Sequence, residues 1–207
     1  TSMDRLANVE SAVGEVLAML GRAQTPEERR RLGDDTSNRE IAVLVRVKLC
    51  SAIAKVFLDG FQAERLFFSP YHIWDWIASY SERLQGSAVP NIAAFSLKKG
   101  IDNSNSLFPD KNLRFRGLIC YALNAKLLDT WVEILANDAA GIGKFFAEGA
   151  TIRNRSAVRH LVETLKRLQG ETFLLSLNFE TPSQKQQTME IAKAAVAATA
   201  TSIVEKK

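Results

Sequence analysis

Residues 138–145, Asp-Ala-Ala-Gly-Ile-Gly-Lys-Phe, come nearest in this sequence to a motif that binds nucleotides. A phosphate-binding loop needs a glycine five residues before its Gly-Lys pair, and a serine or threonine after the lysine as a magnesium ligand. Asp138 and Phe145 stand at those two positions, and no predicted strand precedes the segment. The sequence therefore predicts no nucleotide site here.

The other side chains that could act as nucleophiles, bases or metal ligands are few and scattered. The cysteines are Cys50 and Cys120 and the histidines are His72 and His160, at spacings that match no zinc motif. The sequence has no Gly-x-Ser-x-Gly turn to expose a catalytic serine. Its carboxylates are spread along amphipathic segments, as solvent-exposed charges usually are. We therefore predict no catalytic residues, no metal, no cofactor and no enzyme.

Two basic clusters near predicted helix starts supply the candidate partner-binding residues. These residues are Lys111, Arg114, Arg116, Arg153, Arg155 and Arg159. Cations near a helix N-terminus oppose the helix dipole, by roughly 0.3–1 kcal/mol at exposed positions. Either internal carboxylate partners or a function must offset this, and the sequence leaves both explanations open. Since residues two apart point about 200° from each other on a helix, Arg114 and Arg116 cannot share one face.

Length and composition are those of one globular domain. The 207 residues are 46% hydrophobic and 24% charged, which argues against disorder. A domain of this length buries roughly 70% of its unfolded surface and needs no metal or disulfide. Both cysteines lie in apolar helical patterns, which favours buried thiols in a reducing compartment. No apolar run reaches ~18 residues and no signal peptide opens the chain, so we predict a cytoplasmic protein.

The net charge of +4 is modest. It permits an acidic protein partner or a peripheral membrane contact, whereas a dedicated nucleic-acid binder usually concentrates more positive charge. We therefore predict no nucleic-acid partner.

Apolar residues recur at helical spacing along nearly the whole chain. This pattern predicts an all-α fold, a single compact bundle of roughly eight helices. The predicted helices cover residues 6–20, 25–33, 37–60, 69–80, 110–136, 138–149, 158–168 and 182–205. The block 110–136 exceeds the length of an ordinary helix, and asparagine is a poor interior helix residue, so we expect a break near Asn124.

Three other segments differ from this pattern. Residues 85–109, with their glycines, prolines and polar run, predict a variable loop with one short helix around 92–97. Residues 172–179 alternate apolar and polar side chains and predict an extended segment or a short buried turn. The opening Thr1-Ser2-Met3 looks like a remnant of cloning, so we expect 1–207 to be one domain taken from a longer protein.

Residues 113–128, Leu-Arg-Phe-Arg-Gly-Leu-Ile-Cys-Tyr-Ala-Leu-Asn-Ala-Lys-Leu-Leu, resemble the RUN-domain pattern Arg-x-Arg-x-Trp-Leu-x-x-Ala-Leu-Asn-x-x-x-Leu. Residues 49–61, 140–146 and 165–178 are similar to other segments of that family, in family order. The segment at Ser69-Pro70 and the last helix look closer to the RUN and SH3 domain adaptors than to the RUN and FYVE subgroup. In two departures, Gly117-Leu118 replaces the usual x-Trp, and a polar stretch replaces the family's basic loop.

The resemblance implies a helical module without catalysis that binds a GTP-loaded small GTPase of the Rab, Rap or Arf-like type. It implies an adaptor in vesicle trafficking or signalling, cytoplasmic and peripheral to endomembranes or vesicles. In several family members the basic residues of Arg-x-Arg contribute to the GTPase contact, and Arg114 and Arg116 match them.

Two alternatives to nucleotide-dependent GTPase binding stay open. The first is a scaffold domain that binds a partner helix or a motor subunit whatever nucleotide is bound, through exposed aromatics such as Trp74 or Trp76 or through the alanine-rich last helix. The second is a basic surface that touches anionic lipid.

Overall fold

The computed structural model of the chain describes residues 1–22, 36–64, 68–85 and 91–177. Its α-helices are α1 (Ser2–Arg22), α3 (Thr36–Leu44), α4 (Cys50–Phe57), α5 (Ile73–Arg83), α6 (Ile92–Leu107), α7 (Lys111–Asn124), α8 (Leu128–Ala136), α9 (Ala139–Phe145) and α10 (Arg155–Lys166). A π-helical segment, Val45–Leu49, joins α3 to α4, and a 3-10 turn, Thr151–Arg153, precedes α10. Within the described residues no strand forms, and one isolated antiparallel bridge pairs Phe61 with Phe146. The predicted all-α fold class is confirmed.

The compact unit of the chain is Thr1–Leu175. A second unit runs from Ser176 to Lys207, and of it the structure describes only Ser176 and Leu177. The helices predicted over 25–33 and 182–205 lie outside the described residues, and a single domain over 1–207 stays a prediction. Among the helices that the structure describes, none is both long enough and apolar enough to span a lipid bilayer.

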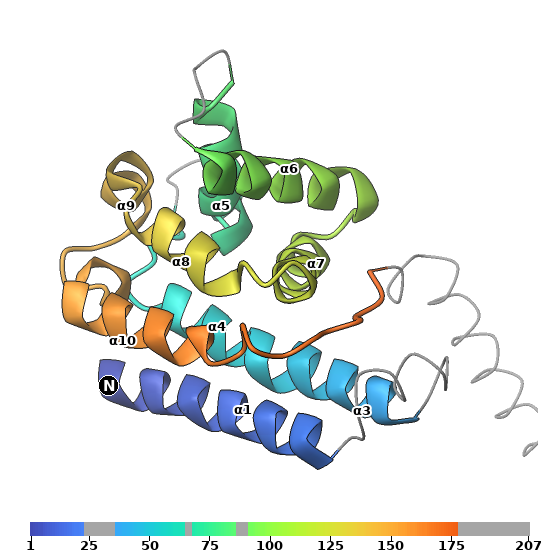
Figure 1. Cartoon of the computed structure of the whole chain (residues 1–207). Helices are drawn as coiled ribbons and strands as arrows, with labels where there is room; N and C mark the ends of the chain where they lie inside the picture. Colours follow the sequence, from blue (N-terminus) through green and yellow to red (C-terminus); the bar gives the residue numbers. More distant parts are fainter. Residues whose placement is uncertain (23–35, 65–67, 86–90, 178–207) are drawn as a thin grey trace, which may run out of the picture. The chain divides into compact units, whose positions relative to one another are not determined.

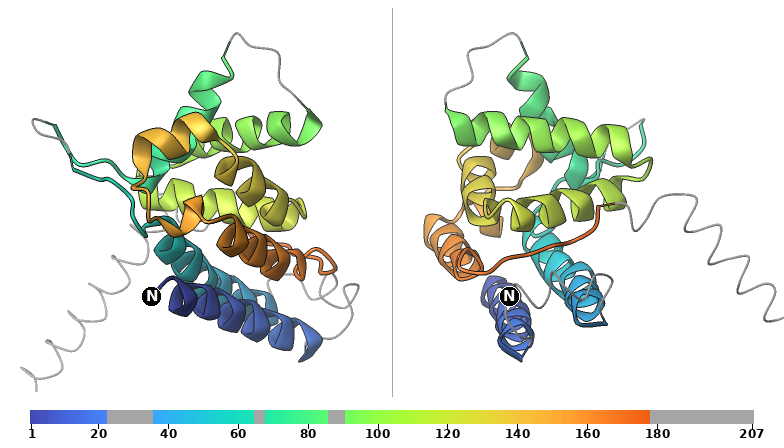
Figure 2. Two further views of the ribbon diagram at one scale, coloured as in Figure 1. Left: turned by 90° about the vertical axis from the view of Figure 1, so that its left-hand side faces the viewer. Right: turned by 45° about the vertical axis from the view of Figure 1, so that its right-hand side comes forward.

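The helices of the compact unit pack in two groups (Figure 1). α1 lies against α4 and α10, and these three helices form one side of the core. α5, α6, α7 and α8 form the other side, where α6 packs on α7. The two sides meet where α8 packs on α10. Two further views show α6 and α7 side by side (Figure 2). α1 buries the apolar stripe that its sequence predicts, with Val9, Val13 and Val16 all inaccessible to solvent.

Aromatic rings from separate segments meet in the core. The Trp76 ring packs edge-to-face on Phe57, with 5.1 Å between ring centroids, and on Phe146, with 4.9 Å. Such pairs add roughly 0.5–1.5 kcal/mol beyond their buried area. Trp74 and Trp76 are 1% and 0% exposed, because α6, α7 and α9 all pack on α5. The hypothesis that these two tryptophans are exposed partner-binding residues is therefore wrong.

The helix predicted over 69–80 would have Ser69 as its N-cap and Pro70 in its first turn. The observed helix, α5, begins three residues later, at Ile73. His72 is the N-cap, and its Nδ1 accepts a hydrogen bond of 3.0 Å from the Trp74 N–H. In return, Asp75 Oδ2 accepts a hydrogen bond of 2.8 Å from the His72 N–H. These reciprocal bonds satisfy two N–H groups that a helix start otherwise leaves without partners, so the helix starts here.

The prediction of a loop over 85–109 is wrong for most of that segment, because residues 92–107 form α6. Asn91 caps the helix, accepting a hydrogen bond of 2.8 Å from the Ala94 N–H. Ala94, Leu97, Gly100, Ile101 and Ser104 are buried at helical spacing, while the polar residues between them face solvent. Gly100 allows a close approach, since a Cβ on it would lie 2.6 Å from the Trp131 ring. The sequence looks like a loop because this buried face contains a glycine and a serine.

The predicted break near Asn124 is confirmed, because α7 ends at Asn124 and α8 begins at Leu128. The Asn124 side chain holds the end of the compact unit: its Nδ2 donates to the Leu175 carbonyl at 2.9 Å, and its Oδ1 accepts from the Leu175 N–H at 2.9 Å. Residues 172–176 form neither helix nor strand, and burial alternates along them, with Phe173 and Leu175 buried and Leu174 exposed. The alternation predicted over 172–179 is therefore confirmed in its described part.

Candidate partner-binding surfaces

Lys111, the first residue of α7, is held by a carboxylate of α5. Its Nζ lies 2.7 Å from Asp75 Oδ1 and donates to Oδ2 at 2.8 Å. Asp75 is the residue that also accepts the His72 N–H in the α5 capping box. Asp75 thus offsets the unfavourable position of the Lys111 charge at the start of α7. For Lys111, the explanation by an internal carboxylate partner holds.

Arg114 lies at the turn between α6 and α7. Its Nε donates a hydrogen bond of 2.7 Å to the Phe108 carbonyl, and one Nη donates to the Pro109 carbonyl at 3.4 Å. Phe108 is the C-cap of α6, so the half-buried guanidinium binds carbonyl groups at and just beyond the end of that helix. Arg114 therefore closes the α6–α7 turn.

Arg116 lies in different surroundings from Arg114, in agreement with the angle between residues two apart on a helix. It lines a pocket of about 140 Å³ formed by α4, α7 and the start of α5. The pocket is formed by Cys50, Ser51, Ala54, Leu58, His72, Ile73, Asn112, Phe115 and Arg116. In it, His72 Nε2 and Asn112 Oδ1 are 3.1 Å apart. Of the first cluster, Arg116 is the residue placed beside the outer side of α4.

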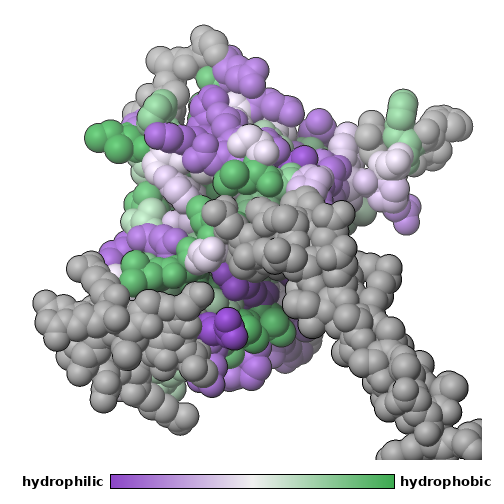
Figure 3. Space-filling view, turned by 90° about the vertical axis from the view of Figure 1, so that its right-hand side faces the viewer, coloured by the Kyte–Doolittle hydropathy of each residue, from purple (hydrophilic) through white to green (hydrophobic). Residues whose placement is uncertain are grey.

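Exposed aliphatic side chains follow one side of the helical run from α3 through the π-helical segment to the residue that caps α4. Val47 and Leu58 are 62% and 54% exposed, and Val43, one turn earlier, is 53% exposed. We define the α4–α7 face as Val47, Ser51, Ala54, Leu58, Asn112 and Arg116, of which the first four follow at intervals of four, three and four residues along one side of a helix. Figure 3 shows the side of the molecule that lies at the right of Figure 1, near α3, and on it hydrophobic residues lie among polar ones.

Two lysines flank this face. Lys48 Nζ forms an ion pair with Glu15 of α1, and Lys55 is exposed and forms no ion pair with any described residue. The face therefore combines aliphatic side chains with positive charge. The sequence prediction missed it, although a signal was present: Val43, Val47 and Leu58 fall outside the core stripe Ile41, Leu44, Val45, Leu49, Ile53, Val56 and Phe57.

The second basic cluster surrounds the start of α10. Arg153 is half-buried and one Nη donates to the Ile142 carbonyl at 3.2 Å. Arg155 and Arg159 are exposed, and the structure gives them no ion pair with a described residue. α10 packs on α1 and α8, whereas α7 packs mainly on α5, α6 and α8. The two clusters therefore belong to different sets of neighbouring helices.

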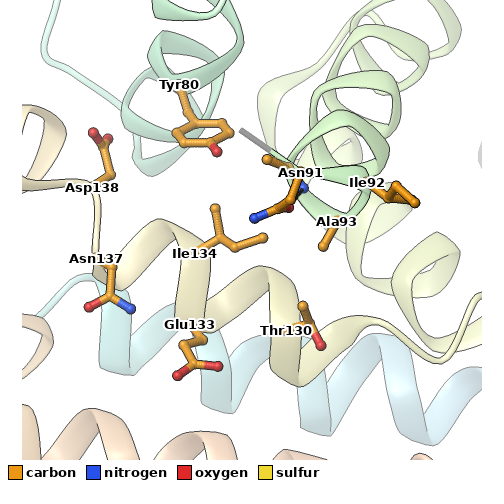
Figure 4. Close-up of a pocket in the computed structure, with 10 residues that line it drawn as sticks. Tyr80, Asn91, Ile92, Ala93, Thr130, Glu133, Ile134, Asn137 and Asp138 are labelled. Atoms are coloured by element: carbon orange, nitrogen blue, oxygen red, sulfur yellow. Dashed lines mark hydrogen bonds between the residues drawn. The ribbon is translucent and has the colours of Figure 1, made fainter. Parts of the chain in front are cut away.

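A larger groove lies between α5, α6 and α8 (Figure 4). Its volume is about 750 Å³, and it is lined by Tyr80, Asn91, Ile92, Ala93, Ala94, Thr130, Glu133, Ile134, Asn137 and Asp138. Partial burial and then the nearby Asp138 carboxylate raise the pKa of Tyr80, against the opposing effect of Arg83. The phenol is thus a neutral hydrogen-bond donor at physiological pH.

Residues that could hold a metal do not gather within the described parts of the chain. No group of three or more His, Cys, Asp or Glu side chains there could hold an ion. Cys50 and Cys120 are buried free thiols, the state that their apolar surroundings in the sequence favour. The features that the described residues do form are a helical face with mixed chemistry and a groove.

Comparison with known proteins identifies relatives of this chain. A family model described as "RUN domain" matches residues 48–179. Small G protein signaling modulator 3 of Rattus norvegicus is 23% identical over 179 residues, covering 75% of this chain and 24% of that protein. The Homo sapiens protein of the same name is 24% identical over 178 residues, covering 74% and 24%. The chain thus spans about a quarter of the length of these relatives.

Proposed function

Because the chain belongs to the RUN domain family, we propose that it is a protein-interaction module that binds a GTP-loaded small GTPase of the Rab, Rap or Arf-like type. The relatives' name, small G protein signaling modulator, supports a role beside small GTPases. The module serves an adaptor in vesicle trafficking or signalling, in the cytoplasm at the periphery of endomembranes.

The observation that carries this proposal is the composition of the α4–α7 face. Val47 and Leu58 offer exposed aliphatic area on either side of Ser51 and Ala54, and Arg116 supplies positive charge at its edge. Interfaces of this kind gain affinity from apolar and arginine contacts at the centre, and rate and specificity from surrounding charge. A transient signalling contact needs only a small area of this kind.

The basic residues predicted from the sequence contribute to this proposal in different ways. Arg116 is the cation we place in the GTPase contact. Lys111 and Arg114 hold the start of α7, Lys111 through Asp75 and Arg114 through the Phe108 carbonyl. Arg155 and Arg159, exposed on α10, form an alternative contact together with Arg153.

The test is capture of a panel of Rab, Rap and Arf-like proteins, each loaded with a GTP analogue or with GDP. We expect one subset to bind in the GTP form, and Val47→Glu or Arg116→Glu to weaken that capture by about tenfold. The charge-matched control is Lys99→Glu on α6, an exposed lysine without an ion pair to a described residue. Circular dichroism of each variant checks the fold.

Three results would contradict parts of the proposal. Equal capture with both nucleotides, or no capture, would favour a scaffold that ignores nucleotide state. Loss of capture in Arg155→Glu and Arg159→Glu, but not in Arg116→Glu, would move the contact to α10. Binding to vesicles of anionic lipid, without binding to any GTPase, would favour the membrane alternative.

A further inference from the structure

The groove between α5, α6 and α8 shares no residue with the α4–α7 face, and the function proposed above leaves it unused. Its volume of about 750 Å³ exceeds what a side chain or two would fill. Figure 4 shows Tyr80 of α5, Asn91 at the start of α6 and Ile134 of α8 around one hollow. The groove is therefore a second surface that could receive a partner.

The walls of the groove combine small residues with two isoleucines, Ile92, which is exposed, and Ile134, which is half-buried. Ala93 and Ala94 of α6 and Thr130 of α8 leave space close to the backbone of both helices. Ile92 stands at the edge and is 88% exposed, the largest exposed fraction among the large hydrophobic residues that the structure describes. Its exposed side chain adds apolar area at the edge of the groove, beside the half-buried Ile134.

The polar groups around the groove carry an excess of negative charge. Asp138 is compensated by an ion pair with Arg83. Glu133 of α8 is exposed and pairs with no cation among the described residues. Asn91 and Asn137 add neutral amide groups, and no lysine or arginine lines the groove. An approaching partner thus meets apolar area beside an uncompensated carboxylate.

We propose that this groove docks an amphipathic helix of a partner protein, with its apolar side in the groove and a lysine or arginine opposite Glu133. A helix in a groove between helices places anchors at i, i+3 or i+4 and i+7, and Ile92 and Ile134 would contact such anchors. The basic residue follows from charge complementarity. A second copy of this chain fits less well, because a two-fold contact would oppose the same acidic edges.

The test is selection from a displayed library of helical peptides against the whole chain. We expect the enriched peptides to carry lysine or arginine beside an apolar stripe. By fluorescence anisotropy, Ile92→Glu should weaken binding of a selected peptide by about tenfold and Glu133→Lys by about fivefold. Ile92→Glu should not disturb folding, since the side chain is exposed and an acid suits the first turn of a helix.

The matched control is Glu148→Lys, which makes the same charge change at an exposed position outside the groove and should leave the affinity unchanged. The proposal is overturned if no peptide is enriched, if enriched peptides lack basic residues, or if the two groove variants bind as tightly as the parent. It is also overturned if sedimentation shows a dimer that Ile92→Glu dissociates, since the occupant is then a second copy. None of these outcomes affects GTPase capture by the α4–α7 face.

Discussion

Lys111 Nζ lies 2.7 Å from Asp75 Oδ1, so the first residue of α7 is tied to the residue that closes the capping box of α5. The Asp75 carboxylate therefore forms two interactions, since it also accepts a hydrogen bond from the His72 N–H. It joins the starts of two helices that carry the His72 and Asn112 side chains of the α4–α7 pocket.

Replacing Lys111 by methionine keeps the length of the side chain and removes its charge. We expect the free energy of unfolding to fall by about 0.5–1 kcal/mol, because the ion pair is partly exposed and lies at the upper end of what surface pairs contribute. Urea unfolding of Lys111→Met and of the control Lys99→Met, which breaks no ion pair, provides the comparison. Equal loss in both variants would contradict a structural role for Lys111.

Gly100 and Gly14 both lie inside helices, but only Gly100 faces another helix. A Cβ on Gly100 would lie 2.6 Å from Trp131, whereas one on Gly14 would meet nothing within 4 Å. We expect Gly100→Ala to destabilise the protein by about 1–3 kcal/mol through overpacking. Gly14→Ala should stabilise it by about 0.5–1 kcal/mol, since alanine favours a helix more than glycine does.

Thermal and urea unfolding of the two alanine variants measure this difference. If Gly100→Ala were as stable as Gly14→Ala, α6 would not pack closely on Trp131 of α8. That packing positions the start of α6, and with it the groove residues Ala93 and Ala94, so its loss would also remove the groove.

The acidity of Asp102 makes the stability of α6 depend on pH. Partial burial by itself would raise the pKa of Asp102, but hydrogen bonds from Lys98 Nζ, at 2.7 Å, and Ser81 Oγ, at 2.6 Å, outweigh it, with help from the Lys98 charge, and lower the pKa. A carboxyl whose pKa is lower in the folded state stabilises fully above its unfolded value of about 4. This contribution is lost as the pH falls from about 4 through the folded pKa.

The check is the free energy of unfolding as a function of pH for the parent and for Asp102→Asn. The variant should be less stable at neutral pH, and the difference should shrink as the pH falls below about 4. A difference that is constant over the whole range would show that the charge of Asp102 is not what stabilises its contacts.

The helical class, most helices and the break at Asn124 could be predicted because each leaves a local pattern: apolar spacing, capping residues, or a poor helix former. α6 could be predicted only around 92–97, because its buried face continues with Gly100 and Ser104, which look like loop residues, and Gly100 owes its burial to Trp131, which is distant in sequence.

The candidate site was predicted only in part, for a similar reason. The partners of the basic residues are distant in sequence or are backbone groups: Lys111 pairs with Asp75, and Arg114 binds the Phe108 carbonyl. No spacing in the sequence reveals such contacts. Exposure of Val47 and Leu58 could have been inferred, since both lie outside the apolar stripe of their helix, but the groove depends on how α5, α6 and α8 meet.

Asn124 is the residue through which α7 holds the segment that ends the compact unit. Its amide donates to the Leu175 carbonyl and accepts from the Leu175 N–H, both at 2.9 Å. Asn124→Asp keeps the size and the acceptor but replaces the donor by a charge facing a carbonyl oxygen. We expect it to lower the free energy of unfolding by about 1–3 kcal/mol and to increase amide exchange at residues 172–175.

The control for this prediction is Asn103→Asp, the same change at an exposed position of α6. Hydrogen exchange measured by mass spectrometry on both variants separates the local effect from a global one. Because Phe173 and Leu175 are buried by the segment that Asn124 holds, its release should expose apolar area next to α7 and raise binding of a hydrophobic dye. If exchange at 172–175 were unchanged in Asn124→Asp, the two hydrogen bonds would not be what keeps this segment in place, and the buried side chains of Phe173 and Leu175 would have to do so alone.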